Sequence, residues 1–381
     1  MRKTFRYRLL GGKTVFQKAN NWLYLCRRLY NTALEQRISI YKQNKTTISC
    51  YDQINQLPDL KNGFPEYKDV GSQVLQEVLE RLDKAYKSFF RRIKEGKVKK
   101  EVGFPRFKGR YRYDSFTLKN TGWKLNDKHL TIKNIGRFKL RLSREIQGDI
   151  KTVTIRRDDT GKWYVSFSCD NVPERKLPVL DTAIGLDVGI KSFLVDSEGN
   201  KVDNPKYYRK AQNLLRRRQR KFNRRVKGSH RRRKARLLVA RAHDKVKNQR
   251  NDFLHKLANR YVDNYGTLVF EDLNIKGMVK NHCLAKSISD SSWGKFYELC
   301  AWKAAEAGRQ VVRIPRFEPS SKRCSDCGAI NQALKLSDRT WVCKSCGALH
   351  DRDYNAAINI RRVGVGQALQ EVTYAVTQSV S

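Results

Sequence analysis

Four cysteines near the C-terminal end of the chain have the spacing of a metal site. Cys324 and Cys327 form one Cys-x-x-Cys pair, and Cys343 and Cys346 form a second pair after fifteen intervening residues. A spacing of three residues lets two thiolates converge on one ion, and the glycine after each pair allows the tight turn beneath it. Four protein ligands leave no open coordination position, so the sequence predicts a structural zinc ion.

Three acidic residues occupy positions where a nuclease would hold its metals. Asp187 lies in an apolar strand predicted to end at Gly189, Glu271 ends a second apolar strand, and Asp353 opens a predicted helix. A carboxylate in an apolar strand is costly unless it is paired or coordinates a metal. Each acid alone would be read as a structural or turn residue. Two strand-borne acids and one at a helix start are how RNase H-like nucleases gather ligands for two Mg²⁺ ions.

The charge of the chain predicts a polyanionic partner. Its 381 residues include 80 Lys and Arg against 37 acidic residues, a formal net charge of +43. Self-repulsion of this size is destabilising unless a polyanion neutralises it, and nucleic acid is the commonest one. The hydrophobic content of 39% is that of a folded protein, with length for two or three domains. We expect no membrane partner and no targeting segment, because no long apolar stretch is visible.

The basic residues are concentrated in one segment. Residues 206–250 hold twenty Lys or Arg and one acid, Asp244, within one or two long helices predicted over 206–262. An apolar stripe in the second half indicates that these helices pack on the protein, so we predict a nucleic-acid contact and not merely a solvated face. The residues expected to make it are Arg216, Arg217, Arg218, Arg220, Lys221, Arg224, Arg225, Arg231, Arg232 and Arg233.

Hydrophobic periodicity changes along the chain. Helical spacing predicts two helices, over 13–42 and 72–94, with a loop between them. From 103 to about 172 the pattern alternates as in strands, which predicts a small β-rich unit that the opening strand 4–10 is expected to join. From residue 181 onward strands and helices alternate, which predicts an α/β domain with a central sheet.

The order of these motifs resembles the RuvC domain of TnpB proteins, which are transposon-encoded relatives of type V CRISPR effectors. The resemblance is carried by 185–189, 270–274, the two cysteine pairs and the segment 350–360, which reads His-Asp-Arg-Asp-Tyr-Asn-Ala-Ala-Ile-Asn-Ile. N-terminal segments agree, at 29–35, 82–90 and 103–108, so the resemblance reaches from near the start to about Arg362. One departure precedes the first cysteine, where Ser-Ser-Lys replaces the Thr-Ser-Gln of many relatives, so no role is carried over to Lys322.

The resemblance implies roles for the three acids. Asp187 would bridge both Mg²⁺ ions, and Glu271 and Asp353 would complete their coordination during in-line phosphodiester hydrolysis. Between the two acids at the helix start we choose Asp353, because the family motif keeps an Asp two residues before its Asn, here Asn355. Asp351 is then structural or a support for the ligands.

The resemblance also implies an α+β multidomain fold. A helical recognition lobe and a β-barrel-like wedge domain would precede an RNase H-like α/β nuclease domain with an inserted zinc ribbon. The expected bounds are 1–12 and 103–175 for the wedge, 13–102 for the recognition domain, 179–318 and 349–362 for the nuclease domain, 319–348 for the ribbon and 363–381 for a disordered tail. The aromatic residues of the wedge either stack on bases or pack a small core; they are Phe104, Phe107, Tyr111 and Tyr113.

The function implied by the resemblance is RNA-guided DNA cleavage. The expected cofactors are structural Zn²⁺, two catalytic Mg²⁺ ions and a guide RNA, and the expected target is double-stranded DNA beside a short recognition motif. The protein would act in the prokaryotic cytosol or nucleoid as a monomer with its RNA, with a dimer as the alternative. Two other functions remain open: a nuclease-inactive RNA-guided repressor, and an unguided zinc-ribbon nucleic-acid-binding protein. All three acids are present, which favours the active nuclease.

Overall fold

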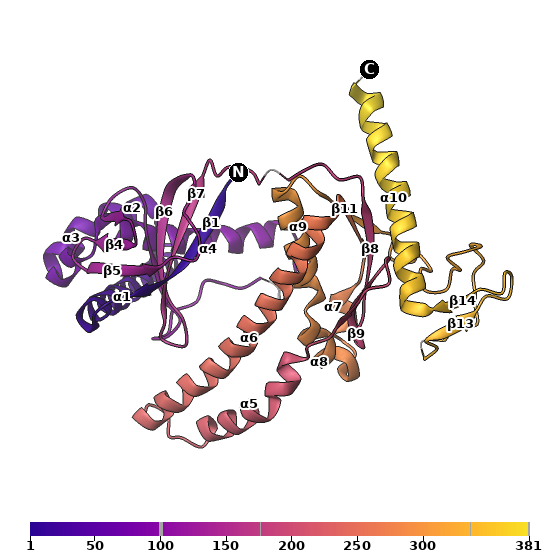
Figure 1. Cartoon of the computed structure of the whole chain (residues 1–381). Coiled ribbons are helices and arrows are strands. Elements are labelled where there is room, and N and C mark those ends of the chain that lie inside the picture. Colours follow the sequence, from indigo (N-terminus) through magenta and orange to yellow (C-terminus); the bar gives the residue numbers. More distant parts are fainter. Residues whose placement is uncertain (99–101, 176, 336, 380–381) are drawn as a thin grey trace. The chain divides into compact units, whose positions relative to one another are not determined.

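The chain folds into two compact units. The computed structural model describes the backbone of residues 1–98, 102–175, 177–335 and 337–379, and side chains through residue 366. The first unit is Met1–Pro173 and the second is Glu174–Ser381. Each unit has its own sheet and its own hydrophobic core (Figure 1).

The first unit is built on a seven-stranded antiparallel sheet with the order β2-β6-β7-β1-β5-β4-β3. Its strands are β1 (Lys3–Leu10), β2 (Ser115–Leu118), β3 (Trp123–Asn126), β4 (His129–Ile132), β5 (Gly136–Arg141), β6 (Asp149–Arg157) and β7 (Trp163–Asp170). The opening strand lies inside the sheet, paired with β7 and β5, as the sequence predicts. The helices after β1 are therefore inserted between strands of one sheet. Closure of this sheet into a barrel stays a prediction.

Two long helices pack on this sheet, α1 (Lys13–Asn44) and α4 (Ser72–Lys94), at the positions that the periodicity predicts. The sequence predicts a loop between these two helices, and this prediction is wrong. The segment forms α2 (Cys50–Asn55), α3 (Leu57–Gly63) and the 3₁₀ helix η1 (Pro65–Asp69). The reason is local: Ser49 and Asp52 form a reciprocal capping box at the start of α2. A proline in the first turn of α3 is also tolerated. Proline lacks a backbone N–H, and an N–H in the first turn has no partner within the helix.

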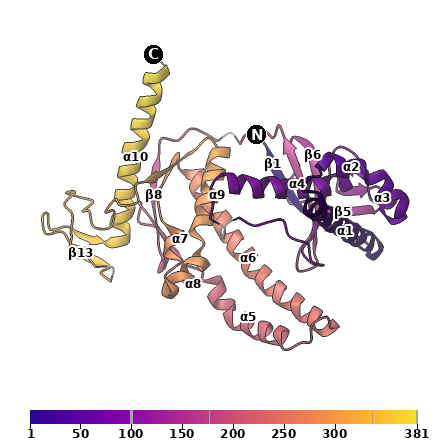
Figure 2. The ribbon, with the colours of Figure 1, turned by 180° about the vertical axis from the view of Figure 1, so that it is seen from behind.

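The second unit is built on a five-stranded mixed sheet with the order β10-β9-β8-β11-β12. Its strands are β8 (Ala183–Val188), β9 (Ser192–Asp196), β10 (Lys201–Asp203), β11 (Thr267–Glu271) and β12 (Gln310–Ile314). The three strands β8, β11 and β12 are parallel, so their carboxyl ends meet at one edge. The helices that pack on the sheet are α6 (His230–Asn264) and α9 (Trp293–Glu306) on one face and α10 (Arg352–Ser379) on the other (Figure 2).

The pleat of these strands assigns each residue to a face. Ile184 and Leu186 of β8 pack among the apolar side chains of α6 and α9. The residue between them, Gly185, faces α10, where a Cβ would lie 2.1 Å from the carbonyl oxygen of Ala357. Only glycine therefore allows α10 to lie this close to the strand, and the alternation turns Asp187 toward the same helix.

The basic segment forms a helical hairpin of two helices, α5 (Tyr207–Asn223) and α6. The sequence predicts one or two helices over 206–262, and the structure has two. Two helices after β11, α7 (Ile275–Met278) and α8 (His282–Ser291), were not predicted. The backbone of α10 continues to Ser379, where the sequence predicts a disordered tail; residues 380–381 of that tail lie outside the described residues. Among the described helices, none is long and apolar enough to cross a membrane.

Candidate functional site

Strand register brings two of the three predicted acids side by side. Leu186 of β8 is paired with Phe270 of β11, so the next residues, Asp187 and Glu271, are neighbours at the carboxyl edge of the sheet. Both side chains point to the face that α10 covers. The third acid, Asp353, lies in the first turn of that helix.

The charges of the other two acids act on Asp187. Burial, followed by the charges of Asp353 and Glu271, raises the pKa of Asp187 well above its ordinary value, and Arg352 offsets only part of this. Burial also raises the pKa of Glu271. Carboxylates crowded in this way are neutralised by protons or by a cation, and oxygen donors of this kind suit Mg²⁺.

Asp351 and Asp353 have different surroundings. The carboxylate of Asp351 accepts the backbone N–H groups of Asp353 and Tyr354, both at 3.1 Å, and pairs with the Lys201 ammonium at 2.8 Å. These contacts hold the pKa of Asp351 below its usual range although burial acts in the opposite direction. Asp353 contributes to the raised pKa of Asp187 and lies 3.6 Å from the guanidinium of Arg339. Asp351 thus caps α10, while Asp353 belongs to the acid cluster.

The four cysteines predicted to bind zinc lie together, with all Sγ atoms within 4.8 Å of one another. The Sγ atoms of Cys324 and Cys346 are 3.7 Å apart, and those of Cys327 and Cys343 are 3.6 Å apart. Each knuckle closes at a glycine with positive φ, 80° at Gly328 and 77° at Gly347. The strands β13 (Thr340–Val342) and β14 (Leu349–Asp351) carry the second knuckle to the start of α10.

These sulfur positions fit a tetrahedral metal ion. Zinc–sulfur bonds of about 2.3 Å place the sulfurs of a tetrahedron roughly 3.8 Å apart, whereas a disulfide needs about 2.05 Å. Without a metal the thiols share their protons unequally: the backbone N–H groups of Cys346 and Ser345 lower the pKa of Cys343 to about 6, while contacts with the neighbouring thiols raise the pKa of Cys346 to about 12.

Three residues around the ribbon were missed at the level of sequence. His350 is buried, and its Nε2 lies 3.0 Å from Sγ of Cys324. Asn355 and Asn359 of α10 are buried, and both donate their side-chain amides to carbonyl groups of the first knuckle, at 2.8 and 2.7 Å from Arg323 O. The Asn-x-x-x-Asn spacing was a usable signal, because it places two amides on one face of a helix.

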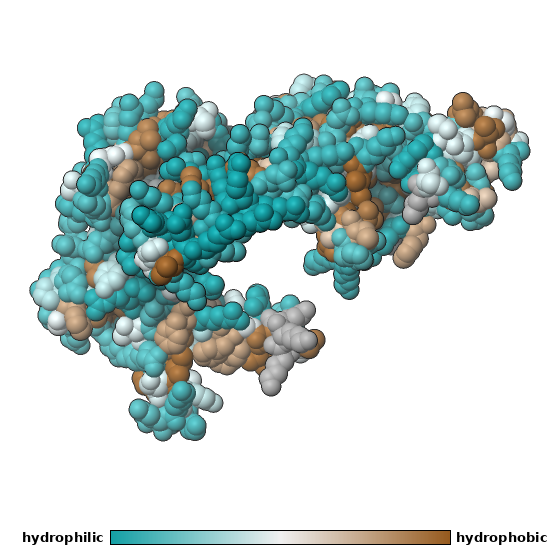
Figure 3. Space-filling model, turned by 90° about the horizontal axis from the view of Figure 1, so that it is seen from below, coloured by the Kyte–Doolittle hydropathy of each residue, from teal (hydrophilic) through white to brown (hydrophobic). Residues whose placement is uncertain are grey.

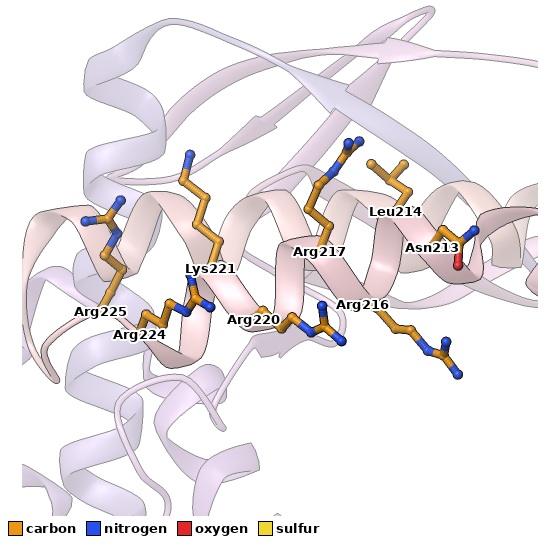
Figure 4. Close-up of a pocket in the computed structure, with 8 residues that line it drawn as sticks. All are labelled: Asn213, Leu214, Arg216, Arg217, Arg220, Lys221, Arg224 and Arg225. Atoms are coloured by element: carbon orange, nitrogen blue, oxygen red, sulfur yellow. The ribbon is translucent and has the colours of Figure 1, made fainter.

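The basic hairpin carries a hollow of about 780 Å³ along α5. Figure 4 shows its lining side chains on successive turns of the helix. Six of the ten predicted cations line it: Arg216, Arg217, Arg220, Lys221, Arg224 and Arg225. We call these six residues the α5 cations. Figure 3 views the molecule from below, the side toward which the hairpin projects in Figure 1, and this face is mainly hydrophilic.

Two of the other predicted cations donate hydrogen bonds to backbone carbonyls within the hairpin. Arg218 donates to the carbonyl of Leu238 at 2.9 Å, joining α5 to α6. Arg232 donates to the carbonyl of Arg225 at 2.6 Å, and its guanidinium lies 4.2 Å from the ring centre of Phe222. Arg231 and Arg233 are exposed in the first turn of α6. Some cations of the basic segment thus stabilise the hairpin and others line the hollow along α5, and composition alone does not distinguish the two groups.

The four aromatic residues of the segment 103–113 differ in burial. Tyr113 is 5% exposed and packs in the core of the first unit. Phe104, Phe107 and Tyr111 are 44, 49 and 48% exposed. The core interpretation therefore holds for Tyr113. Phe104 packs edge-on against the rings of Tyr86 and Phe89, and base stacking by the exposed rings stays a prediction. Lys322, to which no role was carried over, donates to the carbonyl of Gln332 at 3.4 Å.

Comparison with known proteins gives the family. The model of a family described as "probable transposase" matches residues 166–282, and that of a Cas12f1-like TNB domain matches 293–360. A putative RNA-guided DNA endonuclease of Streptomyces pristinaespiralis is 34% identical over 378 residues, covering 96% of this chain and 90% of the relative. InsQ of Escherichia coli K12, another putative RNA-guided DNA endonuclease, is 30% identical and covers 95% and 92%. The chain therefore belongs to the TnpB family of putative RNA-guided endonucleases.

A solved structure shares the α+β fold. The cryo-EM structure of a Cas12f1 complex with guide RNA and target DNA superposes with a TM-score of 0.57 at 13% identity, covering 95% of this chain and 98% of Cas12f1. At this identity the likeness concerns the fold alone.

Proposed function

We propose that this protein is a transposon-encoded, RNA-guided DNA endonuclease whose nuclease centre consists of Asp187, Glu271 and Asp353. The observation that carries the proposal is the placement of Asp187 beside Glu271 at one sheet edge, close enough to Asp353 of α10 for both charges to act on Asp187, in a chain of the TnpB family. The order of the five strands, with three parallel strands and an antiparallel hairpin, supports an RNase H-like, RuvC-type domain.

Asp187, Glu271 and Asp353 would together hold two Mg²⁺ ions. Asp187 is central to this set, because the charges of both other acids raise its pKa. When bound, such ions lower the pKa of water and stabilise the leaving oxygen of a phosphodiester. Lys201 and the cap formed by Asp351 hold the start of α10, and thereby the backbone of Asp353, in place.

Zinc in the cysteine cluster would be structural. The spacing of the thiol groups fits a tetrahedral ion, and four thiolates leave no position for a substrate. The buried amides of Asn355 and Asn359 then join the folded ribbon to the helix that carries Asp353.

The α5 cations would bind the backbone of the guide RNA or of its heteroduplex with target DNA. Arginine and lysine contacts to phosphate are independent of sequence, so base pairing would read the target. The first unit, with its helices and its seven-stranded sheet, would supply the recognition and wedge functions that the family resemblance implies.

A plasmid cleavage assay tests this function. The protein is co-expressed with RNA from downstream of its own gene and incubated with Mg²⁺ and a plasmid library, in which a guide-matched target is flanked by randomised bases. Asp187→Ala removes the central carboxylate, and Asp252→Asn is the matched control, because Asp252 forms an exposed pair with Lys256. Cleavage that depends on guide match, flanking sequence and Asp187, and that survives Asp252→Asn, supports the proposal.

The other outcomes separate the alternatives. Retained RNA and motif-selective binding without cleavage would indicate a nuclease-inactive repressor. Absence of bound RNA and of guide dependence would leave an unguided nucleic-acid-binding protein.

A further inference from the structure

The N-terminus of the basic helix α5 has no cap of its own. Lys206, at the N-cap position, has left-handed backbone with φ 49° and makes no side-chain cap hydrogen bond, and the first turn holds no acidic residue. The first N–H groups of a helix lack partners within it, and the positive end of its dipole disfavours a cation. The missing acceptors must come from another element.

Asp290, in the last turn of α8, supplies them. Its Oδ1 accepts the backbone N–H of Tyr208 at 2.9 Å, and its Oδ2 accepts that of Arg209 at 3.2 Å. The guanidinium of Arg250, on α6, donates to Oδ1 at 2.9 Å. The Asp290 side chain is only 4% exposed, so these donors and not water hold its charge. One buried carboxylate thus joins α5, α6 and α8.

A second set of polar contacts continues to the strand that carries Asp187. The side-chain amide of Asn204, just before α5, donates to Oγ of Ser291 at 2.9 Å and to the carbonyl of Ile190 at 3.1 Å. Ser291 follows Asp290 and is buried, and Ile190 lies in the loop directly after β8. The start of α5 is therefore connected to the end of the strand that holds Asp187.

We propose that Asp290 is a positioning residue, which fixes the α5 cations relative to the carboxylates of the sheet. The α5 cations begin at Arg216, about two turns beyond the capped N–H groups, on a helix of 17 residues. A small rotation at the capped end is therefore amplified along the cation row. The proposal rests on the proposed function, because it takes the ligand of the α5 cations to be the nucleic acid that the acids cleave.

Hydrogen exchange of the full-length protein tests the cap directly. Asp290→Ala removes both acceptors, Asp290→Asn keeps one oxygen, and Asp252→Asn removes one negative charge from an exposed pair as the control. In Asp290→Ala the amides of Tyr208 and Arg209 should exchange roughly tenfold faster or more, with Asp290→Asn between this variant and the wild type. Exchange in β11 should not change in any variant.

Single-turnover cleavage by the guide-loaded protein tests the positioning. Asp290→Ala should slow cleavage by roughly ten- to a hundredfold, because a misplacement of about 1 Å has this effect on a reaction. Affinity for target DNA should stay within about twofold, because the α5 cations remain. Arg250→Gln leaves the α5 cap intact and should give a smaller loss of rate than Asp290→Ala.

Each remaining outcome has one meaning. Wild-type exchange at Tyr208 and Arg209 in Asp290→Ala, or cleavage at the wild-type rate, would overturn the proposal. Faster exchange throughout the second unit, with rate and affinity falling together, would assign Asp290 to general stability and overturn it as well. Failure of the wild type to cleave guide-matched DNA would instead contradict the proposed function, and the exchange experiment would still decide whether Asp290 holds α5.

Discussion

The backbone N–H of Ser325, inside the first cysteine knuckle, donates to Oδ1 of Asn355 on α10 at 2.8 Å. Two residues before Asn355 on the same helix is Asp353. The amide of Asn355 also donates to the carbonyl of Arg323, so one buried side chain satisfies both a donor and an acceptor of the knuckle. The four-cysteine segment and the acid cluster are consequently connected through buried hydrogen bonds of one helix.

Replacing Asn355 by Ala should weaken this connection. The buried N–H of Ser325 loses its partner, which destabilises by about 1–3 kcal/mol, whereas the carbonyl of Arg323 keeps its hydrogen bond from Asn359. We expect a lower midpoint of thermal unfolding and faster release of zinc to a chromogenic chelator. Tyr354→Phe is the control, because Tyr354 is exposed and the change removes only a hydroxyl. Unchanged zinc release in Asn355→Ala would mean that the ribbon holds its metal independently of α10.

Features defined by local spacing could be predicted from the sequence, and features that depend on distant partners could not. The cysteine pairs each specify their own turn, and β8 and β11 show apolar runs that end at Asp187 and Glu271. The role of Asp290 depends instead on N–H groups about eighty residues earlier in the chain. Helix α8 has ten residues, and three of its four buried residues are polar, so residue type does not mark Asp290 as a buried position.

Removing the charge of Asp187 should stabilise the metal-free protein. Below the ordinary pKa of 3.8, Asp187 is protonated in both the folded and unfolded states and contributes nothing. As pH rises, the unfolded state ionises first, so the wild type loses stability until the raised folded-state pKa is passed, and the loss persists above it. At pH 7 without Mg²⁺, Asp187→Asn should therefore be more stable than the wild type.

Denaturant unfolding across pH measures this difference. The gain of Asp187→Asn should disappear near pH 3, and added Mg²⁺ should stabilise the wild type but not the variant. Equal stability of the two proteins at pH 7 in the absence of Mg²⁺ would contradict the electrostatic account of the acid cluster.

Asp351 and Asp353 should respond differently to replacement by Asn. Asp351→Asn keeps the oxygen that caps α10 and loses only the ion pair with Lys201, so it should cost less than about 1 kcal/mol of stability and slow cleavage by no more than roughly tenfold. Asp353→Asn removes a proposed metal ligand, so its loss of cleavage should exceed a hundredfold and should shift the Mg²⁺ dependence to higher concentration. Cleavage rates over a Mg²⁺ titration distinguish them. The reverse order of severity would reassign the ligand to Asp351.

The cysteine cluster should hold one zinc ion per chain. Cys343→Ser should lower the zinc content measured by elemental analysis and reduce the midpoint of thermal unfolding, because binding energy at a structural site is folding energy. Cys283→Ser should retain full zinc content, since Cys283 is exposed and lies outside the cluster. A full complement of zinc in Cys343→Ser would rule out a four-cysteine site.

The α5 cations should act through phosphate charge. Replacing Arg216, Arg220 and Arg224 together by Gln should weaken binding of guide RNA and heteroduplex about equally for all sequences. It should also lower the slope of log affinity against log salt by roughly 0.7–0.9 for each phosphate that the variant no longer neutralises. Arg232→Met is the comparison, because Arg232 stacks on Phe222 and donates to backbone within the hairpin. That variant should leave the salt slope near the wild-type value while loosening the hairpin. A triple variant with an unchanged slope would mean that these arginines are solvated and that the nucleic acid binds on another surface.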